Sequence, residues 1–331
     1  MKKKLFVIDG HALCYRAYYA FIKNPLVNSK GQNTSAIYGF ARMIYKLIED
    51  HTPDYLAVAF DPPVKSFRFQ LFEDYKATRQ KTPDDLKPQI DEIKRMVDIL
   101  GLPVIENPEY EADDILGSIA KQMVSSELDI VLVTSDKDAY QLLNPGIAIL
   151  SPKKGISDYE VYGENEVYNK LGITSAQMID YLALMGDSSD NIPGVKGIGE
   201  KSAQKLISQY GSLDEIYNNL NEITPPRIKQ LLEDGKDSAL LSRDLATIRC
   251  DVTIPFKLED MTLKDIFSEK AYKFFIENEM PAIIRDCFAE QSLPVPEKQV
   301  VAKDYKIRAF IHLNASSSFS LYTSVSSLNL L

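Results

Sequence analysis

The sequence predicts an α/β fold in which a mainly parallel central sheet is flanked by helices, followed by a second, helical lobe. Two observations favour this fold. Short continuous apolar runs alternate with helical segments through the first half of the 331-residue chain, as in a parallel sheet covered on both faces. Beyond about residue 164 the strand signals thin out, and short helices separated by glycine and proline take over. A chain of this length can form two lobes.

The predicted elements follow from the spacing of the apolar residues. In the first half, strands are expected over 5–9, 55–61, 103–106 and 129–136, and helices near 12–22, 35–50, 83–101 and 111–123. In the second lobe, helices are expected over 175–186, 199–211, 212–220, 224–235 and 268–280. Residues 291–331 are expected to be a proline-marked linker and an atypical, disordered tail.

Composition narrows the class of protein. Three unclustered cysteines indicate neither a disulfide framework nor a thiolate metal site, so a reducing cytoplasm is expected. No apolar run approaches the roughly 18 residues that span a bilayer, so no membrane partner is expected. The net charge of −9 would ordinarily argue against a nucleic-acid partner. That argument fails if many of the acids hold metal ions.

Three of the four predicted strands in the first half end in aspartate, namely Asp9, Asp61 and Asp136. The active crevice of an open α/β sheet lies outside the carboxyl ends of its strands, so these side chains are expected at one edge. Loops are polar in any protein, and that remains the alternative explanation. Three strand ends out of four favour a site.

More carboxylates are expected at the same edge. The one strand that does not end in aspartate is 103–106, and the helix after it begins with Glu111, Asp113 and Asp114. Later segments add Asp138, Asp187 and Asp190. The alternative is that acids simply favour the first turn of a helix. Two such charges ~4 Å apart repel by about 1 kcal/mol in water and ~4 kcal/mol at a dielectric of 20. Nine carboxylates therefore suggest two hard divalent cations, as in phosphodiester hydrolysis.

Two further segments suggest phosphate contact. Residues 192–211 fit neither a P-loop nor a dinucleotide fingerprint, but fit two short helices joined by a glycine hairpin that holds a phosphate. A plain packing corner is the alternative. Residues 65–81 carry five Lys or Arg, two acids and four aromatics, which suits nucleic acid, although an amphipathic helix with a solvated basic face would look the same.

Six motifs occur together: VIDGH (7–11), AFD (59–61), YKATR (75–79), YEADD (110–114), TSDKD (134–138) and MGDSSDNIPGVKGIGEKSA (185–203). In this order and spacing they closely resemble the bacterial 5′-nuclease family, which includes the N-terminal 5′-3′ exonuclease domain of DNA polymerase I, flap endonucleases and phage 5′ exonucleases. The resemblance covers roughly residues 1–290. It implies a PIN-like 5′-nuclease fold with a helix-hairpin-helix lobe.

The resemblance also implies roles for individual residues. One Mg²⁺ would be held by Asp61, Glu111, Asp113 and Asp114 with Asp9 close by, and a second by Asp136, Asp138, Asp187 and Asp190, with Mn²⁺ as a substitute. Lys76 and Arg79 would steer the scissile phosphate, assisted by Arg16. DNA contacts would come from Gly194, Lys196, Gly197, Gly199, Lys201, Ser202, Lys205, Tyr75 and Arg68, with K⁺ at the helix-hairpin-helix.

The domains implied are a nuclease domain over 1–170 with a helical arch at about 64–82, and a helical DNA-binding domain over 171–290 with its helix-hairpin-helix at 192–208. The expected substrates are 5′ flaps, nicks and RNA–DNA primers, in a monomer of the bacterial cytoplasm, near the nucleoid and beside a covalent or separate polymerase. A non-catalytic, structure-specific DNA-binding module is the main alternative. A Mg²⁺-dependent phosphatase is disfavoured, because Asp9-Gly10-His11 lacks the second aspartate that its nucleophile motif needs.

Overall fold

The computed structural model describes residues 2–153 and 158–288. One compact unit spans Met1–Gln291. The linker and tail predicted over 291–331 lie outside the described residues. Within the described ranges, no helix has both the length and the apolar character that crossing a membrane requires.

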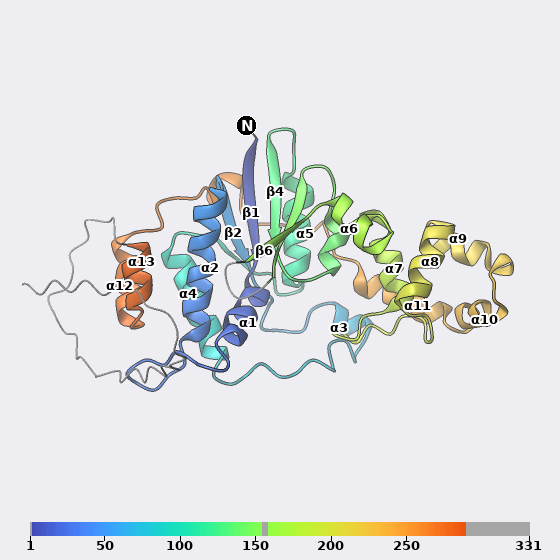
Figure 1. Cartoon of the computed structure of the whole chain (residues 1–331), viewed down its shortest axis with the longest axis horizontal. Helices are drawn as coiled ribbons and strands as arrows, with labels where there is room; N and C mark the ends of the chain where they lie inside the picture. Colours follow the sequence, from blue (N-terminus) through green and yellow to red (C-terminus); the bar gives the residue numbers. More distant parts are fainter. Residues whose placement is uncertain (1, 154–157, 289–331) are drawn as a thin grey trace, which may run out of the picture. The chain divides into compact units, whose positions relative to one another are not determined.

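A six-stranded sheet forms the centre of the unit, with strand order β3-β2-β1-β4-β5-β6 (Figure 1). Its strands are β1 (Lys3–Asp9), β2 (Tyr55–Ala59), β3 (Val104–Ile105), β4 (Leu128–Val133), β5 (Ile147–Pro152) and β6 (Tyr159–Tyr162). The first five are parallel, and β6 pairs antiparallel with β5 at the edge. The predicted mainly parallel sheet is confirmed.

The prediction missed β5 and β6. No α-helix separates β4 from β5, only the short 3₁₀ helix Asp138–Leu142, so the alternation of strand and helix does not mark β5. The edge strand β6 has exposed residues and lacks a continuous apolar run.

Helices cover both faces of the sheet. α1 (Gly10–Ala20), α2 (Ser35–His51) and α4 (Lys87–Ile99) lie on one side, and α5 (Ala112–Met123) lies on the other (Figure 1). Every residue of β2 is consequently buried, which explains its unbroken apolar sequence. The parallel arrangement brings the carboxyl ends of β1, β2 and β4 to one edge.

The helical lobe follows β6. It contains α6 (Glu164–Leu171), α7 (Met178–Met185), α8 (Glu200–Tyr210), α9 (Leu213–Asn218), α10 (Pro226–Asp234) and α11 (Lys236–Ala246). The prediction of one helical domain over 171–290 needs a correction. α12 (Glu269–Glu277) contacts α4, and α13 (Pro281–Cys287) contacts α2, so both pack on the α/β part. Phe275 of α12 lies against Tyr45 of α2.

The expected helical arch at 64–82 is also corrected. Its only helix is α3 (Arg68–Leu71), a single turn, and the rest of the segment consists of turns and extended chain. Contacts with other segments take the place of helical hydrogen bonds. The Phe67 N–H donates to the Glu109 carbonyl at 3.1 Å, and the Lys76 N–H donates to the Asp190 carbonyl at 2.8 Å.

The glycine segment differs from the prediction as well. Residues 192–208 contain one helix, not two, and the helices that flank the glycine loop are α7 and α8, which contact each other. Gly194 has a positive φ of 60° and faces the backbone of Gly186. A side chain there would overlap that backbone, so glycine is required for packing as well as for conformation.

We expect Gly194→Ala to lower the free energy of unfolding by about 2 kcal/mol or more, because the new Cβ meets rigid backbone at a positive φ. Gly199→Ala is the matched control, since its Cβ would have no neighbour within 4 Å and its φ is −103°. Its effect should stay within about 1 kcal/mol. Urea unfolding measures both, and equal losses would contradict the packing argument.

Candidate active site

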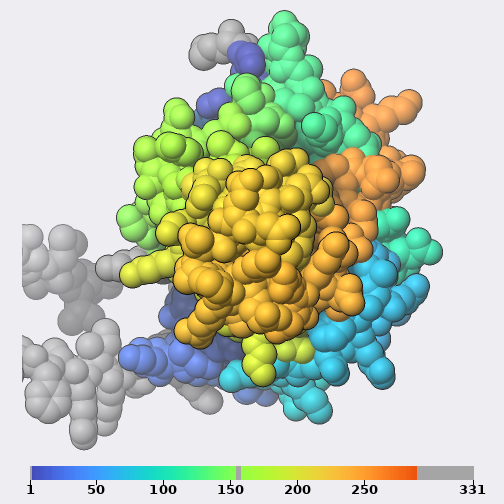
Figure 2. Space-filling model, turned by 90° about the vertical axis from the view of Figure 1, so that its right-hand side faces the viewer, coloured from blue at the N-terminus to red at the C-terminus, as the bar shows by residue number. Residues whose placement is uncertain are grey.

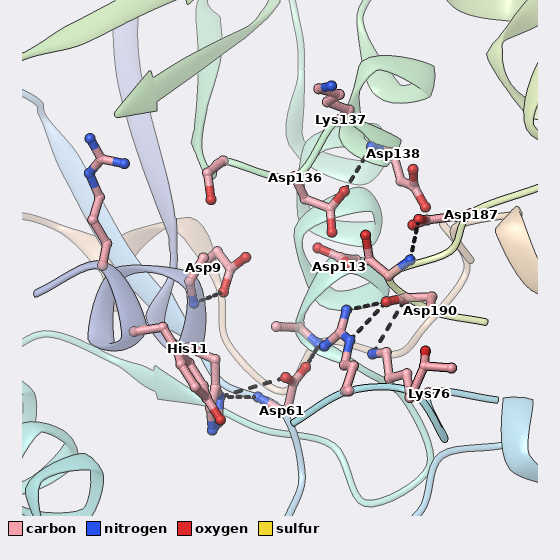
Figure 3. A pocket seen from close by; sticks show the side chains of 18 of the residues that line it. Asp9, His11, Asp61, Lys76, Asp113, Asp136, Lys137, Asp138, Asp187 and Asp190 are labelled. Atoms are coloured by element: carbon pink, nitrogen blue, oxygen red, sulfur yellow. Dashed lines mark hydrogen bonds and ion pairs between the residues drawn. The ribbon is translucent and has the colours of Figure 1, made fainter. Parts of the chain in front are cut away.

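A pocket of about 1380 Å³ opens at the carboxyl ends of β1, β2 and β4. Figure 3 shows carboxylates from distant parts of the chain turned towards it. Seven of the nine predicted acids line it: Asp9, Asp61, Asp113, Asp136, Asp138, Asp187 and Asp190. The pocket also receives Lys76, Arg79 and Arg16, the three predicted catalytic cations.

Strand β1 positions Asp9, and Thr134 links it to the next strand end. Asp9 Oδ1 accepts the Ala12 N–H at 2.9 Å and so caps α1. The buried Thr134 hydroxyl donates to Asp9 Oδ2 at 3.0 Å and accepts the Asp136 N–H at 3.1 Å. One hydroxyl therefore ties the Asp9 carboxylate to the backbone of Asp136, a role that the sequence prediction missed.

Asp61 is positioned from both sides. Its Oδ1 accepts the Ala112 N–H at the start of α5 at 2.8 Å, and its own N–H donates to His11 Nδ1 at 3.0 Å. Burial lowers the pKa of His11, and the accepted hydrogen bond requires an unprotonated Nδ1, so the imidazole is neutral. His11 lines the pocket but was absent from the predicted site. Its place two residues after Asp9, just past a strand end, was the available signal.

The electrostatics of the pocket suit a cation. Burial and the charge of Asp61 raise the pKa of Asp9 to about 7. Burial and the charge of Asp136 raise the pKa values of Asp113 and Asp138 well above the usual range for aspartate. A cation bound among these oxygens would stabilise the ionised carboxylates, which burial and mutual repulsion disfavour. Carboxylate oxygens are also the donors that hard divalent ions prefer.

The carboxylates line one pocket, but their oxygens are not arranged around a single metal position. Among the residues that the structure describes, no group of three Asp, Glu, His or Cys side chains is arranged to hold a metal ion. The donor chemistry fits divalent ions, but the side chains must rotate inward to ligate one. Seven acids around one pocket supply more oxygens than a single octahedral ion needs.

Lys76 and Arg79 neutralise part of this charge. Lys76 Nζ donates to Glu111 Oε2 at 2.8 Å and lies 3.8 Å from Asp190 Oδ2, and Arg79 Nε donates to Asp190 Oδ1 at 2.8 Å. Glu111 itself does not line the pocket, because it lies behind Lys76 and also accepts the Ser66 hydroxyl at 2.8 Å. The structure thus brings the predicted phosphate-steering cations directly to the predicted carboxylates.

Besides Glu111, three more predicted site residues lie outside the pocket. Asp114 is fully buried, does not line the pocket and binds Arg68, so it is not placed as a metal ligand. Arg68 and Tyr75 are each 3% exposed, which leaves neither on a surface that DNA could contact. Both face inward because their polar atoms bind buried carboxylates, Asp114 for Arg68 and Glu111 for Tyr75.

The glycine loop and α8 present most of the predicted DNA contacts at the surface. Lys196, Gly197, Gly199, Lys201 and Lys205 are exposed, and Ser202 is half-buried. Gly194 is the exception, because its buried N–H donates to Ser242 Oγ at 2.9 Å and is unavailable to a phosphate. Figure 2 views the molecule from the side of the helical lobe, and the yellow and gold residues of α8 to α10 lie at the centre of that view.

Two family models match the chain. The one described as 5′-3′ exonuclease, N-terminal resolvase-like domain, matches residues 4–172. The one described as 5′-3′ exonuclease, C-terminal SAM fold, matches residues 173–269. Together they cover both the sheet with its pocket and the helices that carry the glycine loop.

Curated relatives match over most of the chain. It is 44% identical over 284 residues to the DNA polymerase I of Caldicellulosiruptor bescii, covering 85% of this chain and 33% of the relative. It is 40% identical over 275 residues to the DNA polymerase I of Bacillus subtilis strain 168, covering 83% and 31%. The chain therefore spans about a third of the length of these relatives.

Solved structures share the fold. The T5 D15 protein co-crystallised with metal ions gives a TM-score of 0.62 at 19% identity, covering 87% of this chain and 99% of that one. The catalytic core of Rad2 in complex with DNA substrate gives 0.57 at 20% identity, covering 86% and 92%. The predicted PIN-like 5′-nuclease fold is confirmed.

Proposed function

Because the chain belongs to the 5′-3′ exonuclease family, we propose that it hydrolyses phosphodiester bonds near the 5′ ends of branched or nicked DNA and of RNA primers. The observation that supports this most strongly is the pocket in which seven carboxylates from separate strand ends and loops meet Lys76 and Arg79. Cations for the phosphate and oxygen donors for metal ions are thereby side by side.

We propose two divalent ions as cofactors, Mg²⁺ with Mn²⁺ as a substitute. Asp61 and Asp113, with Asp9 close by, would hold one, and Asp136, Asp138, Asp187 and Asp190 would hold the other. Such ions, when bound, lower the pKa of water and stabilise charge in the transition state. Asp114 is left out of this set because Arg68 occupies both of its oxygens, and Glu111 is left out because it does not line the pocket and pairs with Lys76.

Lys76 and Arg79 would act on the phosphate. Lys76 Nζ lies 3.8 Å from the pocket carboxylate of Asp190, and Arg79 Nη2 pairs with the same carboxylate. Both side chains are long enough to turn towards a phosphate. Arg16, from α1, also lines the pocket. Cations that bind the scissile phosphate most strongly in the transition state accelerate the reaction and do not merely increase affinity.

The duplex beside the scissile bond would lie on the glycine loop and the start of α8. Lys196, Lys201 and Lys205 would contact phosphates, and the backbone N–H groups of the exposed glycines would hold one at the helix start. A K⁺ ion in this loop is part of the proposal.

Removing one of these lysines should change the salt dependence of binding. We expect Lys201→Ala to reduce the slope of log affinity against log salt concentration by about 1, because one phosphate contact is lost. Lys46→Ala is the control, since Lys46 lies on α2 and pairs with Asp50 at 2.7 Å. Fluorescence anisotropy with a nicked duplex over a series of salt concentrations measures the slopes. An unchanged slope for Lys201→Ala would place the duplex elsewhere.

Cleavage of a labelled 5′-flap duplex, with and without Mg²⁺ or Mn²⁺, tests the proposed function. We expect products only when a divalent ion is present. Flap binding without any metal-dependent product would instead support the non-catalytic DNA-binding module.

The relatives suggest the setting. Since they are DNA polymerases of which this chain spans about a third, a covalent or separate DNA polymerase is the proposed partner. We propose a monomer that acts in replication and repair in the bacterial cytoplasm, associated with the nucleoid. Size-exclusion chromatography with light scattering would test the monomer.

A further inference from the structure

Arg68 and Asp114 form a buried ion pair behind the wall of the pocket. Arg68 lies on α3 and Asp114 in the first turn of α5, and their side chains are 4% and 0% exposed. Arg68 Nη1 donates to Asp114 Oδ2 at 2.7 Å, and Nη2 donates to Oδ1 at 2.8 Å. Two parallel charge-assisted hydrogen bonds fix the relative orientation of both groups.

The pair also joins a third segment. Arg68 Nε donates to the Leu245 carbonyl at 2.9 Å, and Nη2 donates to the Thr247 carbonyl at 3.0 Å. Asp114 Oδ1 accepts the Arg249 N–H at 2.8 Å, and Oδ2 accepts the Glu111 N–H at 3.1 Å. The segment after β2, the start of α5 and residues 245–249 are therefore held together at one point.

We propose that Arg68 and Asp114 are positioning residues, which fix the start of α5, and with it Glu111 and Asp113, against the segment that carries Lys76 and Arg79. The consequence for catalysis rests on the proposed nuclease function, whereas the consequence for stability does not. Neither residue lines the pocket, so both act through their neighbours.

The hydrogen bonding argues against Asp114 as a metal ligand. Each of its oxygens already accepts two hydrogen bonds. Ligating an ion would require Asp114 to release Arg68, which would leave an unpaired guanidinium in the interior. Asp113, the next residue along, lines the pocket and can take that role without such a cost.

Thermal unfolding in EDTA distinguishes the role of Asp114 from that of Asp113. We expect Asp114→Asn to lower the Tm by about 6 °C or more, because a buried charge loses its partner. Asp113→Asn should leave the Tm unchanged or raise it, since it replaces one of several crowded acids in the pocket with a neutral amide. Arg68→Met should behave like Asp114→Asn, and the double variant should lose clearly less than the sum of the two single losses. Additive losses, or an unchanged Tm for Asp114→Asn, would overturn the pairing.

Mn²⁺ titration by calorimetry tests positioning beyond stability. We expect Asp114→Asn to bind as many Mn²⁺ ions as the wild type, with an affinity about 10- to 100-fold lower, as for a residue that orients ligands. Leu47→Ala is the control, since Leu47 is a core residue of α2 away from the pocket and should lower the Tm without changing Mn²⁺ affinity. Loss of a bound ion in Asp114→Asn would make Asp114 a ligand, and unchanged affinity would make the pair purely structural. Either result overturns the proposal.

If Asp114→Asn does not fold, Arg68→Lys takes its place, because lysine keeps the charge but cannot form the two parallel hydrogen bonds. We expect Arg68→Lys to lower both the Tm and the Mn²⁺ affinity, by less than Asp114→Asn would, and to keep the number of bound ions. A wild type that cleaves no DNA would refute the proposed function, while the unfolding comparison in EDTA would still decide the pairing.

Discussion

Asp138→Asn is expected to abolish cleavage while leaving DNA binding largely intact. Asp138 begins the 3₁₀ helix that follows β4, and its N–H donates to Asp136 Oδ1 at 2.9 Å, so an isosteric amide preserves the local structure. What is lost is a negative charge in the pocket. We expect the single-turnover rate to fall at least about 1,000-fold, on the order of 4 kcal/mol of transition-state stabilisation.

The proposed binding surface for the duplex, by contrast, lies on α8 and the glycine loop, so the Kd for a flap substrate should change less than about 10-fold. Glu109→Gln is the matched control. Glu109 is an exposed acid just before α5, outside both the pocket and the family motifs. Its substitution should leave the rate within about 2-fold. Comparable losses in both variants would mean that general negative charge, rather than the pocket, supports the reaction.

The sheet and its site edge could be predicted because the signals were local. Continuous apolar runs marked β1, β2 and β4, and parallel strands necessarily bring Asp9, Asp61 and Asp136 to the same edge. Which acid at the start of α5 enters the pocket could not be predicted in the same way, because it depends on contacts with residues far away in the sequence. Glu111 and Asp114 do share a helix face, as their spacing of three predicts, but that face meets Arg68, and Asp113 is the one that enters the pocket.

Residues 65–81 illustrate the same limit. Alternating aromatic and basic residues are expected on a surface that binds single-stranded DNA. A segment buried inside the protein can have the same composition when its cations meet buried carboxylates, as Arg68 meets Asp114. Only the position of the partner carboxylate distinguishes a buried segment from a DNA-binding surface. That position depends on contacts such as Arg68 with Leu245, which are 177 residues apart.

Lys76→Ala should slow cleavage far more than it weakens binding. The Lys76 ammonium contacts Glu111 and lies near Asp190, at the boundary between the carboxylates and the open pocket. From this position it can bind a phosphate as charge develops there in the transition state. We expect the single-turnover rate to fall about 100- to 1,000-fold, comparable to the loss of one stabilising donor in an active site.

Binding must be measured without turnover, so the Kd is compared between Asp138→Asn and the double variant Asp138→Asn, Lys76→Ala. A group that acts mainly in the transition state changes this Kd little, by less than about 10-fold. Lys137→Ala is the control, because Lys137 lines the same pocket but, among the described residues, forms no ion pair with a carboxylate. Equal losses of rate and affinity in Lys76→Ala would make Lys76 an ordinary backbone contact. If Lys76→Ala lowers the free energy of unfolding by as much as it raises the activation free energy, the main role of Lys76 is instead to neutralise Glu111. A buried carboxylate without its cation destabilises the fold.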